Sequence, residues 1–158
     1  DKFSKYLHAH PIPEKSSNMA VSYILEQYIP TQGCPKTISS DNDPAFASDA
    51  MQAIYSSFGI RHVQTASYNP KANKVERSHR FLSEYFKKTM EDDFQCWDEA
   101  LPRIVMTYNC TPGKSGLSPM EVHMGRQPYI PFDFLFGTQP KYMGECDVRR
   151  KLQDRERG

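Results

Sequence analysis

Short strand-like runs alternate along this chain with longer segments of helical spacing, and this alternation limits the folds that it can adopt. Runs of mixed apolar and polar residues with the length of strands occur at 6–12, 36–40 and 60–64. In the segments between and after them, apolar residues recur three and four positions apart. Helices are therefore expected at about 17–29, 51–58, 75–90, 97–108 and 119–124. The alternation predicts an α/β fold, a mixed sheet with helices on both faces.

Residues with special backbone preferences mark where these elements begin and end. Ser16 or Ser17 can cap the first helix, and Pro30 and Gly33 are expected to end it. Gly59 occupies the position of a C-terminal stop for the next helix. A capping box with proline at the first helical position is formed by Ser118-Pro119-Met120-Glu121, ahead of a stop at Gly125. The large aromatic residues interpreted as core are Tyr23, Phe58, Trp97 and Tyr108.

The length and composition indicate one folded domain. A chain of 158 residues, 38% of them hydrophobic, can bury a core of its own. Residues 1–137 are expected to form that domain, and residues 138–158, charged and without periodicity, a linker or tail. No apolar run approaches the ~20 residues that a membrane span needs, so no membrane partner is expected. Because the first residue is Asp1 and not Met, the chain is expected to be part of a longer protein.

Charge and cysteine content indicate the cellular compartment but do not indicate the activity. The net charge of +1 does not by itself indicate a nucleic-acid partner, so that case depends on local clusters of cations. The cysteines are scattered, and no pair of them has the spacing of zinc ligands or suggests a disulfide framework. A reducing compartment, cytosol or nucleus, is expected.

Two acidic residues stand out by their positions. Asp41 follows the strand expected at 36–40, where residues that serve open α/β active sites usually lie. Glu76 begins a helix directly after residues 65–74, a polar segment without periodicity. The intervening chain can return to bring both carboxylates together, and hard cations such as Mg²⁺ prefer oxygen ligands of this kind. Taken singly, each has a structural interpretation: a turn or cap residue for Asp41, a helix-dipole partner for Glu76.

Several stretches of this sequence follow one another in a characteristic order and spacing between residue 1 and about residue 137. They read D-K-F-S-K, G-C-P-K-T-I-S-S-D-N-D-P-A-F, F-G-I-R-H-V-Q-T-A-S-Y-N-P-K-A-N-K-V-E-R-S-H-R, W-D-E-A-L-P, T-Y-N-C-T-P and G-L-S-P-M-E-V-H-M-G-R-Q-P. Together they resemble the catalytic core of retroviral and gypsy-type retrotransposon integrases, a branch of the ribonuclease H-like superfamily. The resemblance implies a ribonuclease H-like mixed sheet flanked by helices, with the first strand of that fold missing from this chain.

The resemblance also assigns roles to the two carboxylates. In that family two Asp and one Glu hold a pair of Mg²⁺ or Mn²⁺ ions, and Asp41 and Glu76 match the second and third of them. Asp1 is not taken as the first, because its stretch matches the family's second strand and following hairpin. The first aspartate is therefore expected upstream, and the fragment alone is expected to bind metal weakly and to lack activity. The segment before Glu76 is one residue shorter than is common in the family.

Polar and cationic residues around Glu76 resemble the family's contacts with DNA. A solvated helix face with an ordinary Glu76–Arg80 ion pair is the alternative, worth under about 1 kcal/mol. For His79, a role near the metals and simple exposure are equally compatible with the sequence. Glu121 is interpreted as a capping residue, and the remaining histidines show no ligand spacing. The resemblance implies DNA contacts at Pro44, Tyr68, Lys71, Asn73, Lys74, Arg77, His79 and Arg80.

The function expected from these residues is DNA integration in two metal-dependent steps, 3′-end processing and strand transfer. The expected partners are retroelement-end DNA, target DNA and further copies of the chain in a dimer or tetramer, and the expected location is the nucleus. The alternatives are a domesticated, non-catalytic integrase domain that binds DNA or protein, a nuclease or transposase of the same superfamily, and an oligomerisation scaffold. Loss of the upstream aspartate would favour the domesticated domain.

Overall fold

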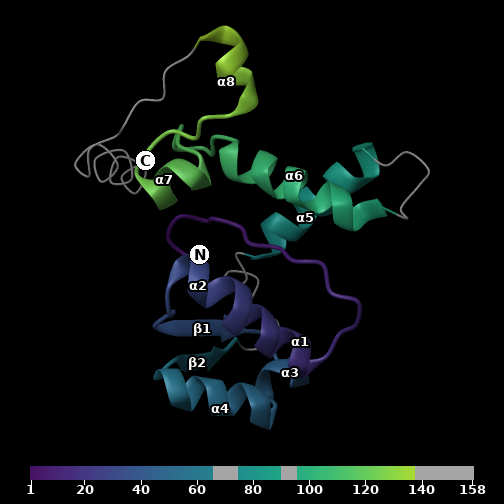
Figure 1. Cartoon of the computed structure of the whole chain (residues 1–158), viewed down its shortest axis with the longest axis vertical. Coiled ribbons are helices and arrows are strands. Elements are labelled where there is room, and N and C mark those ends of the chain that lie inside the picture. The colour runs from purple at the N-terminus through teal and green to yellow at the C-terminus, as the bar shows by residue number, and fades with distance from the viewer. Residues whose placement is uncertain (66–74, 90–95, 138–158) are drawn as a thin grey trace. The chain divides into compact units, whose positions relative to one another are not determined.

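The structure, a computed structural model, describes residues 1–65, 75–89 and 96–137. The chain forms two compact units (Figure 1). The sheet unit comprises His10–Val75, and the helical unit comprises Asp1–Ala9 together with Glu76–Gly158. The expected tail at 138–158 and the polar segment from residue 66 to residue 74 lie outside the described residues.

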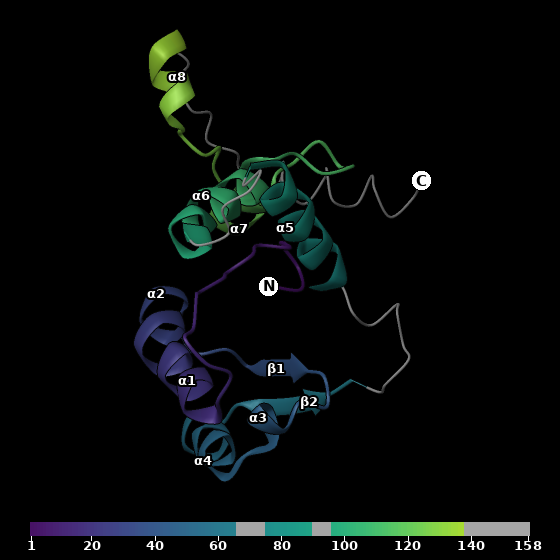
Figure 2. The same ribbon diagram turned by 90° about the vertical axis from the view of Figure 1, so that its right-hand side faces the viewer.

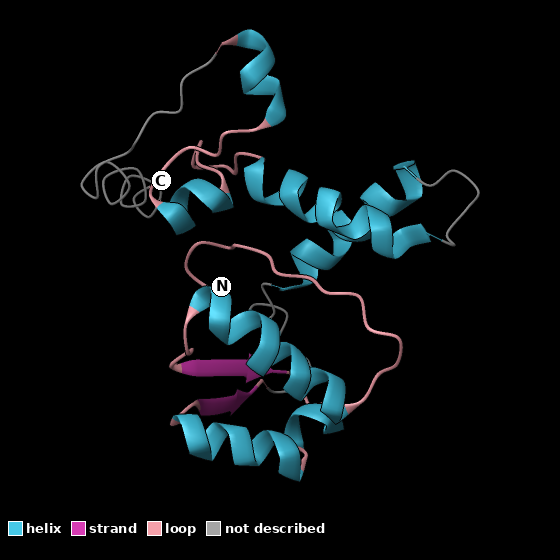
Figure 3. Ribbon diagram, viewed as in Figure 1, coloured by secondary structure: helices cyan, strands magenta, loops and turns pink. Residues whose placement is uncertain are grey.

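The sheet unit contains two strands joined by a helical crossover. Strand β1 (Thr37–Ser40) pairs in parallel with β2 (Arg61–Gln64), and Ile38 lies opposite His62 (Figure 3). Helix α4 (Asp49–Phe58) connects them, as parallel strands require a crossover of this kind. Both strands and the helix lie where the sequence predicts them. Gly59 ends α4 with a φ of 63°, in the left-handed region that suits glycine.

The first helical segment differs from its prediction at Pro30. Ser16 caps α1 (Ser17–Ser22) by accepting from the Met19 amide, as predicted. The chain then continues as a π-helical segment, η1 (Tyr23–Tyr28), and as α2 (Ile29–Gln32), which contains Pro30 and ends at Gly33. A proline inside an α-helix lacks an N–H and clashes with the carbonyl four residues earlier. The π-helical turns of η1 immediately precede Pro30. At their end the Ile29 amide donates to the Ile24 carbonyl, five residues earlier. Because π-helical turns are wider than α-helical ones, Pro30 does not end the helical segment.

The core of the sheet unit lies where these helices meet. Its buried side chains come from η1, α4 and the residue before β2, and α1 contacts both α4 and the short helix α3 (Pro44–Ala47) (Figure 2). Tyr23 packs at the edge of this cluster, but Phe58 is 47% exposed, so its prediction as a core residue is wrong. Phe58 is the last residue of α4, beyond the buried residues Met51, Ile54 and Tyr55 of that helix. The buried cluster consists of Ile24, Met51, Ile54, Tyr55 and Ile60.

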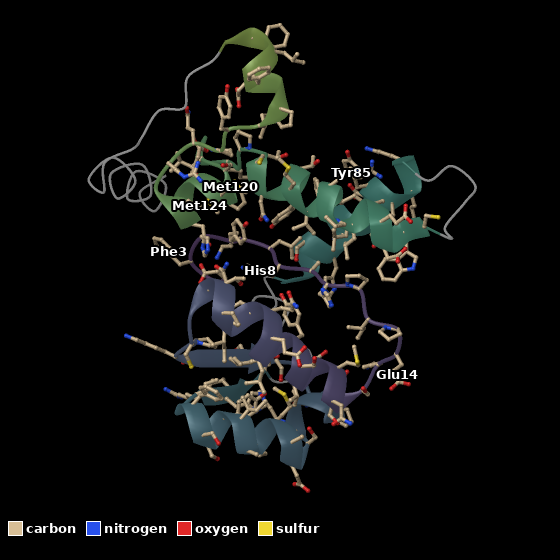
Figure 4. The ribbon with its side chains drawn as sticks, in the orientation of Figure 1. Phe3, His8, Glu14, Tyr85, Met120 and Met124 are labelled. Carbon is tan, nitrogen blue, oxygen red and sulfur yellow. The ribbon has the colours of Figure 1, made fainter. Side chains whose placement is uncertain are left out.

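The helical unit contains α5 (Val75–Thr89), α6 (Trp97–Cys110), α7 (Pro119–Met124) and α8 (Pro131–Phe136). The Phe81 ring of α5 meets Tyr108 of α6 edge-on, with ring centres 5.1 Å apart, and also contacts Tyr85 (labelled in Figure 4). Trp97 is 39% exposed at the start of α6, so it was wrongly predicted as core. The buried apolar residues of this unit are Ala100, Leu101, Ile104 and Leu117.

The strand predicted at residues 6–12 does not form. The chain there has no ladder of backbone hydrogen bonds to a neighbouring strand within the described ranges. The backbone of Leu7 pairs with a side chain instead: its N–H donates to Asn109 Oδ1 and its carbonyl accepts from Asn109 Nδ2, both at 2.9 Å. Pro11 and Pro13 lack the N–H groups that a ladder would use further along.

The capping box at α7 forms as predicted, whereas α8 was not predicted. Ser118 Oγ accepts from the Glu121 amide at 3.2 Å, and Glu121 Oε2 accepts from the Ser118 amide at 2.6 Å. Gly125 then ends the helix in the left-handed conformation. Helix α8 begins at a proline, and Asp133 Oδ2 accepts from the Ile130 amide at 2.9 Å. None of the helices in the described ranges has the length and apolarity that crossing a membrane requires.

Candidate functional site

Asp41 lies immediately after β1, at the end of the parallel strands where the sequence analysis placed it. The residue is exposed, and its carboxylate makes no hydrogen bond or ion pair with the part of the chain that the structure describes. A carboxylate held at a strand end and left to solvent is available to a ligand. Asp43, two positions along the chain, differs in this respect.

The backbone on either side of Asp41 is fastened by side chains. Ser40 is buried, and its Oγ donates to the Asp41 carbonyl at 2.8 Å while lying 2.9 Å from His62 Nε2. The Ser40 carbonyl accepts from both the amide and the hydroxyl of Thr65, at 2.9 and 3.0 Å. The Tyr55 ring stacks on His62 with ring centres 4.6 Å apart. These contacts hold the end of β1 in one arrangement.

Asp43 is engaged in structure. Its Oδ1 accepts from the Ala45 amide at 2.9 Å and so caps α3. The Lys15 ammonium donates to the same carboxylate, which lowers the pKa of Asp43 and raises the pKa of Lys15. This ion pair ties the loop after Asp41 to the segment that leads into α1.

A shallow hollow lies beside this ion pair. Its volume is about 390 Å³, and Pro44, expected from the resemblance to contact DNA, is exposed at its wall. The hollow opens broadly to solvent, so it offers a surface and not an enclosed binding cavity. It is lined by Lys15, Ser16, Ser17, Asp43, Pro44 and Ala45.

Glu76 lies in the first turn of α5, as the sequence predicts. Asp41 belongs to the sheet unit and Glu76 to the helical unit. On α5 the side chains of His79 and Arg80 are exposed, and Arg77 lies between them and Glu76 along the chain. The remaining residues expected to contact DNA lie outside the described residues: Tyr68, Lys71, Asn73 and Lys74.

Two further carboxylates are accounted for by local structure. Asp1 Oδ1 accepts from the Phe3 amide at 2.9 Å, the Ser4 amide at 2.6 Å and the Ser4 hydroxyl at 2.9 Å, which is a turn motif. Glu121 is buried in the capping box of α7. Among the residues described, no three His, Cys, Asp or Glu side chains form a group that could hold a metal ion. Asp1 Oδ1 is therefore engaged in a turn, and Glu121 acts as the capping residue that the sequence predicts.

Sequence reasoning missed His62, Ser40 and Lys15 as neighbours of the Asp41 loop. Strand alternation places Ser40 on the face of Ile38, and the register places His62 beside Ile38. That register joins residues more than 20 positions apart, and no local pattern reports it. Lys15 could have been found only from the path of the chain before α1.

The sequence is similar to that of known viral polyproteins. A family model described as "Integrase core domain" matches residues 1–70. The Gag-Pol polyprotein of avian reticuloendotheliosis virus is 32% identical over 131 residues, which cover 82% of this chain and 11% of that protein. The Pol polyprotein of feline endogenous virus ECE1 is 32% identical over 155 residues, covering 97% of this chain and 15% of that protein. The chain thus spans a small part of the relatives that it matches.

Solved structures show the same similarity in three dimensions. The structure of a simian T-cell lymphotropic virus intasome in complex with a PP2A regulatory subunit matches with a TM-score of 0.65 and 30% identity, over 83% of this chain and 49% of that one. The catalytic core domain of BIV integrase matches with a TM-score of 0.65 and 27% identity, over 77% and 79%. The HTLV-2 integrase catalytic core domain, solved in complex with magnesium in a dimeric form, matches with a TM-score of 0.56 and 25% identity, over 78% of each chain.

Proposed function

The chain belongs to the retroviral integrase catalytic-core family, with its ribonuclease H-like α/β fold, and we propose that the protein containing it joins retroelement DNA to target DNA. The proposed reaction has two steps. Water first cleaves a phosphodiester near the 3′ end of the element's DNA, leaving a free 3′-hydroxyl. That hydroxyl then attacks a phosphodiester of the target and becomes joined to its 5′-phosphate. The 3′-oxygen of the target strand leaves as a 3′-hydroxyl, and the enzyme forms no covalent intermediate.

The observation that carries this proposal is the exposed carboxylate of Asp41 at the end of β1, which makes no hydrogen bond or ion pair with the described residues. One oxygen each of Asp1, Asp43 and Glu121 accepts from backbone amides, and Asp43 also pairs with Lys15. Exposed carboxylate oxygen is the donor type that Mg²⁺ and Mn²⁺ prefer, so the residue fits such an ion. We propose that Asp41 and Glu76 hold two ions together with a third carboxylate that is not Asp1. When bound, the ions would activate the attacking oxygen and stabilise the leaving one.

The proposed roles of this chain's other residues concern DNA. The exposed side chains of His79 and Arg80 on α5 can meet phosphate oxygens, which supply most of the affinity and none of the sequence information. Pro44, beside the Lys15–Asp43 pair, can contact DNA through its shape but has no N–H group to donate a hydrogen bond. Two similar solved structures support the wider setting, since one is an intasome and the other is a dimeric catalytic core in complex with magnesium. Assembly of the chain into an oligomer on DNA is therefore part of the proposal.

Replacement of Asp41 tests the proposal with a matched control. In the intact protein that contains this chain, Asp41→Asn keeps the size of the side chain and removes its charge. Loss of one carboxylate ligand should lower Mn²⁺ affinity by roughly 100-fold or more, beyond the 10–100-fold typical of changes to a ligand's hydrogen-bonding partners. DNA joining should fall below detection. The control is Asp49→Asn, an exposed aspartate of α4 in the same unit, which should leave both unchanged.

Replacement of Glu76 extends the test to the helical unit. Glu76→Gln should match Asp41→Asn in both metal binding and joining, whereas Glu84→Gln, an exposed glutamate on the same helix, should behave as the unchanged protein. Mn²⁺ binding is read by electron paramagnetic resonance and joining by gel analysis of labelled DNA ends. Unchanged metal affinity in Asp41→Asn would contradict the proposal. DNA binding that persists without metal dependence would favour the non-catalytic, domesticated domain.

A further inference from the structure

We propose that His62 is a positioning residue for Asp41, acting through the hydroxyl of Ser40. This inference rests on the proposed function of Asp41 as a metal ligand. It assigns His62 a role that its sequence position in β2 does not suggest, because 20 residues of helix and loop separate β1 from β2. The contact is made entirely within the sheet unit.

The three groups form a chain of hydrogen bonds. His62 Nε2 lies 2.9 Å from Ser40 Oγ, and Ser40 Oγ lies 2.8 Å from the carbonyl oxygen of Asp41. Both distances are those of good hydrogen bonds. Ser40 is buried, so water has little access to its hydroxyl, and His62 is its side-chain partner across the strand pair.

The hydrogen count decides the direction of these bonds. A serine hydroxyl carries one hydrogen, and here that hydrogen goes to the Asp41 carbonyl. The hydroxyl can then only accept from His62, which requires a hydrogen on Nε2 of the ring. The peptide group of Asp41 is thus held by a donor whose own orientation is set by His62.

The ring of His62 is itself held from the far side. Tyr55 of α4 stacks on it at an interplanar angle of 21°, and the Tyr55 hydroxyl donates to the Phe46 carbonyl of α3 at 3.3 Å. Helix α3 begins directly after the Asp41 loop. The loop is therefore fixed at its start through Ser40 and His62 and at its end through α3, with Tyr55 contacting both supports. Groups that orient a metal ligand act on metal affinity without touching the metal.

The first test reads the ring directly and needs neither metal nor activity. Long-range ¹H–¹⁵N correlation spectra of the 158-residue chain report which ring nitrogen of each histidine carries hydrogen. His62 is assigned by its loss from the spectrum of His62→Phe. A hydrogen on Nε2 is expected. A neutral ring with a bare Nε2 would overturn the proposal, since Ser40 would then donate to His62 and not to Asp41.

The second test separates positioning from general stability. In the intact protein, His62→Phe keeps a ring against Tyr55 and removes the nitrogen. Loss of one hydrogen bond predicts a rise of about two- to tenfold in the Mn²⁺ dissociation constant and in the Mg²⁺ concentration for half-maximal joining. The matched control is His10→Phe, because the exposed His10 also stacks on a tyrosine, Tyr23, in the same unit. His10→Phe should leave both quantities unchanged.

A double variant shows whether His62 acts through Ser40. Ser40→Ala should produce the same shift as His62→Phe, and the two changes together should produce no larger shift than either alone. Metal constants in His62→Phe equal to those of the unchanged protein would overturn the proposal, even if the thermal unfolding midpoint fell, because a purely structural role would act on stability alone. If the unchanged protein binds no divalent metal, the proposed function fails instead, and the ring spectra still report on the hydrogen bond.

Discussion

At the scale of single residues, the chemistry available to a carboxylate depends on the hydrogen bonds and ion pairs that its neighbours form with it. Asp1, Asp43 and Asp41 have the same side chain and lie in loops or turns. Asp1 accepts turn hydrogen bonds with its Oδ1, and Asp43 caps a helix and pairs with Lys15, while Asp41 is exposed to solvent. Asp43 is two positions from Asp41, and its lowered pKa marks a structural ion pair. A shifted pKa therefore does not identify the candidate metal ligand in this chain.

Asn109 is the buried polar residue whose loss we expect to be most costly. Only 1% of it is exposed, and its amide pairs with both backbone groups of Leu7. Asn109→Ala leaves those groups without their partner and should lower the free energy of unfolding by about 1–3 kcal/mol. Urea denaturation followed by circular dichroism measures the change.

The control for Asn109 is the exposed Asn18 of α1, a residue of the same type. Asn18→Ala should change the free energy of unfolding by no more than about 0.5 kcal/mol. Equal effects of the two replacements would show that the Leu7 pairing does not stabilise the fold.

At the scale of elements, helix ends follow local chemistry while helix interiors respond to packing. Ser16, Gly59 and the capping box at α7 all act where their residue types predict. Pro30 does not, because the π-helical turns of η1 accommodate it within a segment that packs Ile24 into the core. A rule for a single residue type can thus be overridden by the burial of the segment around it.

The capping box of α7 offers a test at this scale. Ser118→Ala removes the acceptor for the Glu121 amide and should lower the free energy of unfolding by about 1 kcal/mol. Ser83→Ala, at an exposed position within α5, is the comparison and should leave stability unchanged or slightly higher, because alanine favours helix interiors. Thermal and urea unfolding of both variants measures these changes. An unchanged free energy of unfolding in Ser118→Ala would argue against the cap as a stabilising feature.

At the scale of the whole molecule, the division into two units predicts that each core protects its own backbone. Met51 is fully buried in the sheet unit and Ile104 is 1% exposed in the helical unit. Replacing either by alanine should cost about 2–5 kcal/mol. Hydrogen exchange read by mass spectrometry should show faster exchange in α4 and β2 for Met51→Ala, and in α6 and α7 for Ile104→Ala.

Met106→Ala is the control for the exchange experiment, since Met106 is an exposed residue of the same helix as Ile104. It should leave exchange unchanged in both units. If Met51→Ala and Ile104→Ala each accelerated exchange uniformly along the chain, the two units would unfold together, contrary to this prediction.

Much of the candidate site could be predicted because its signals are local. Asp41 follows a strand that its own residues encode, and Glu76 begins a helix with clear apolar spacing. The order of the motifs indicated the family that the chain resembles. The prediction of a strand at 6–12 was wrong because a run of suitable residues forms a strand only when a neighbouring strand accepts and donates its backbone hydrogen bonds. Leu7 bonds to the Asn109 side chain instead. The predictions of Phe58 and Trp97 as core residues were wrong because helical spacing does not tell how far a core extends along a helix.

The sequence by itself determined the helix ends at Ser16, Gly59 and α7, the crossover between the parallel strands and the position of Asp41 after the first of them. These depend on backbone preferences and on residues within a few positions of one another. Only the tertiary structure decided that Lys15 pairs with Asp43 while the Asp41 carboxylate bonds to none of the described residues, and that His62 reaches Ser40 across the strand pair. Those outcomes depend on strand register and on the path of Lys15, contacts between residues more than 20 positions apart that no local pattern specifies.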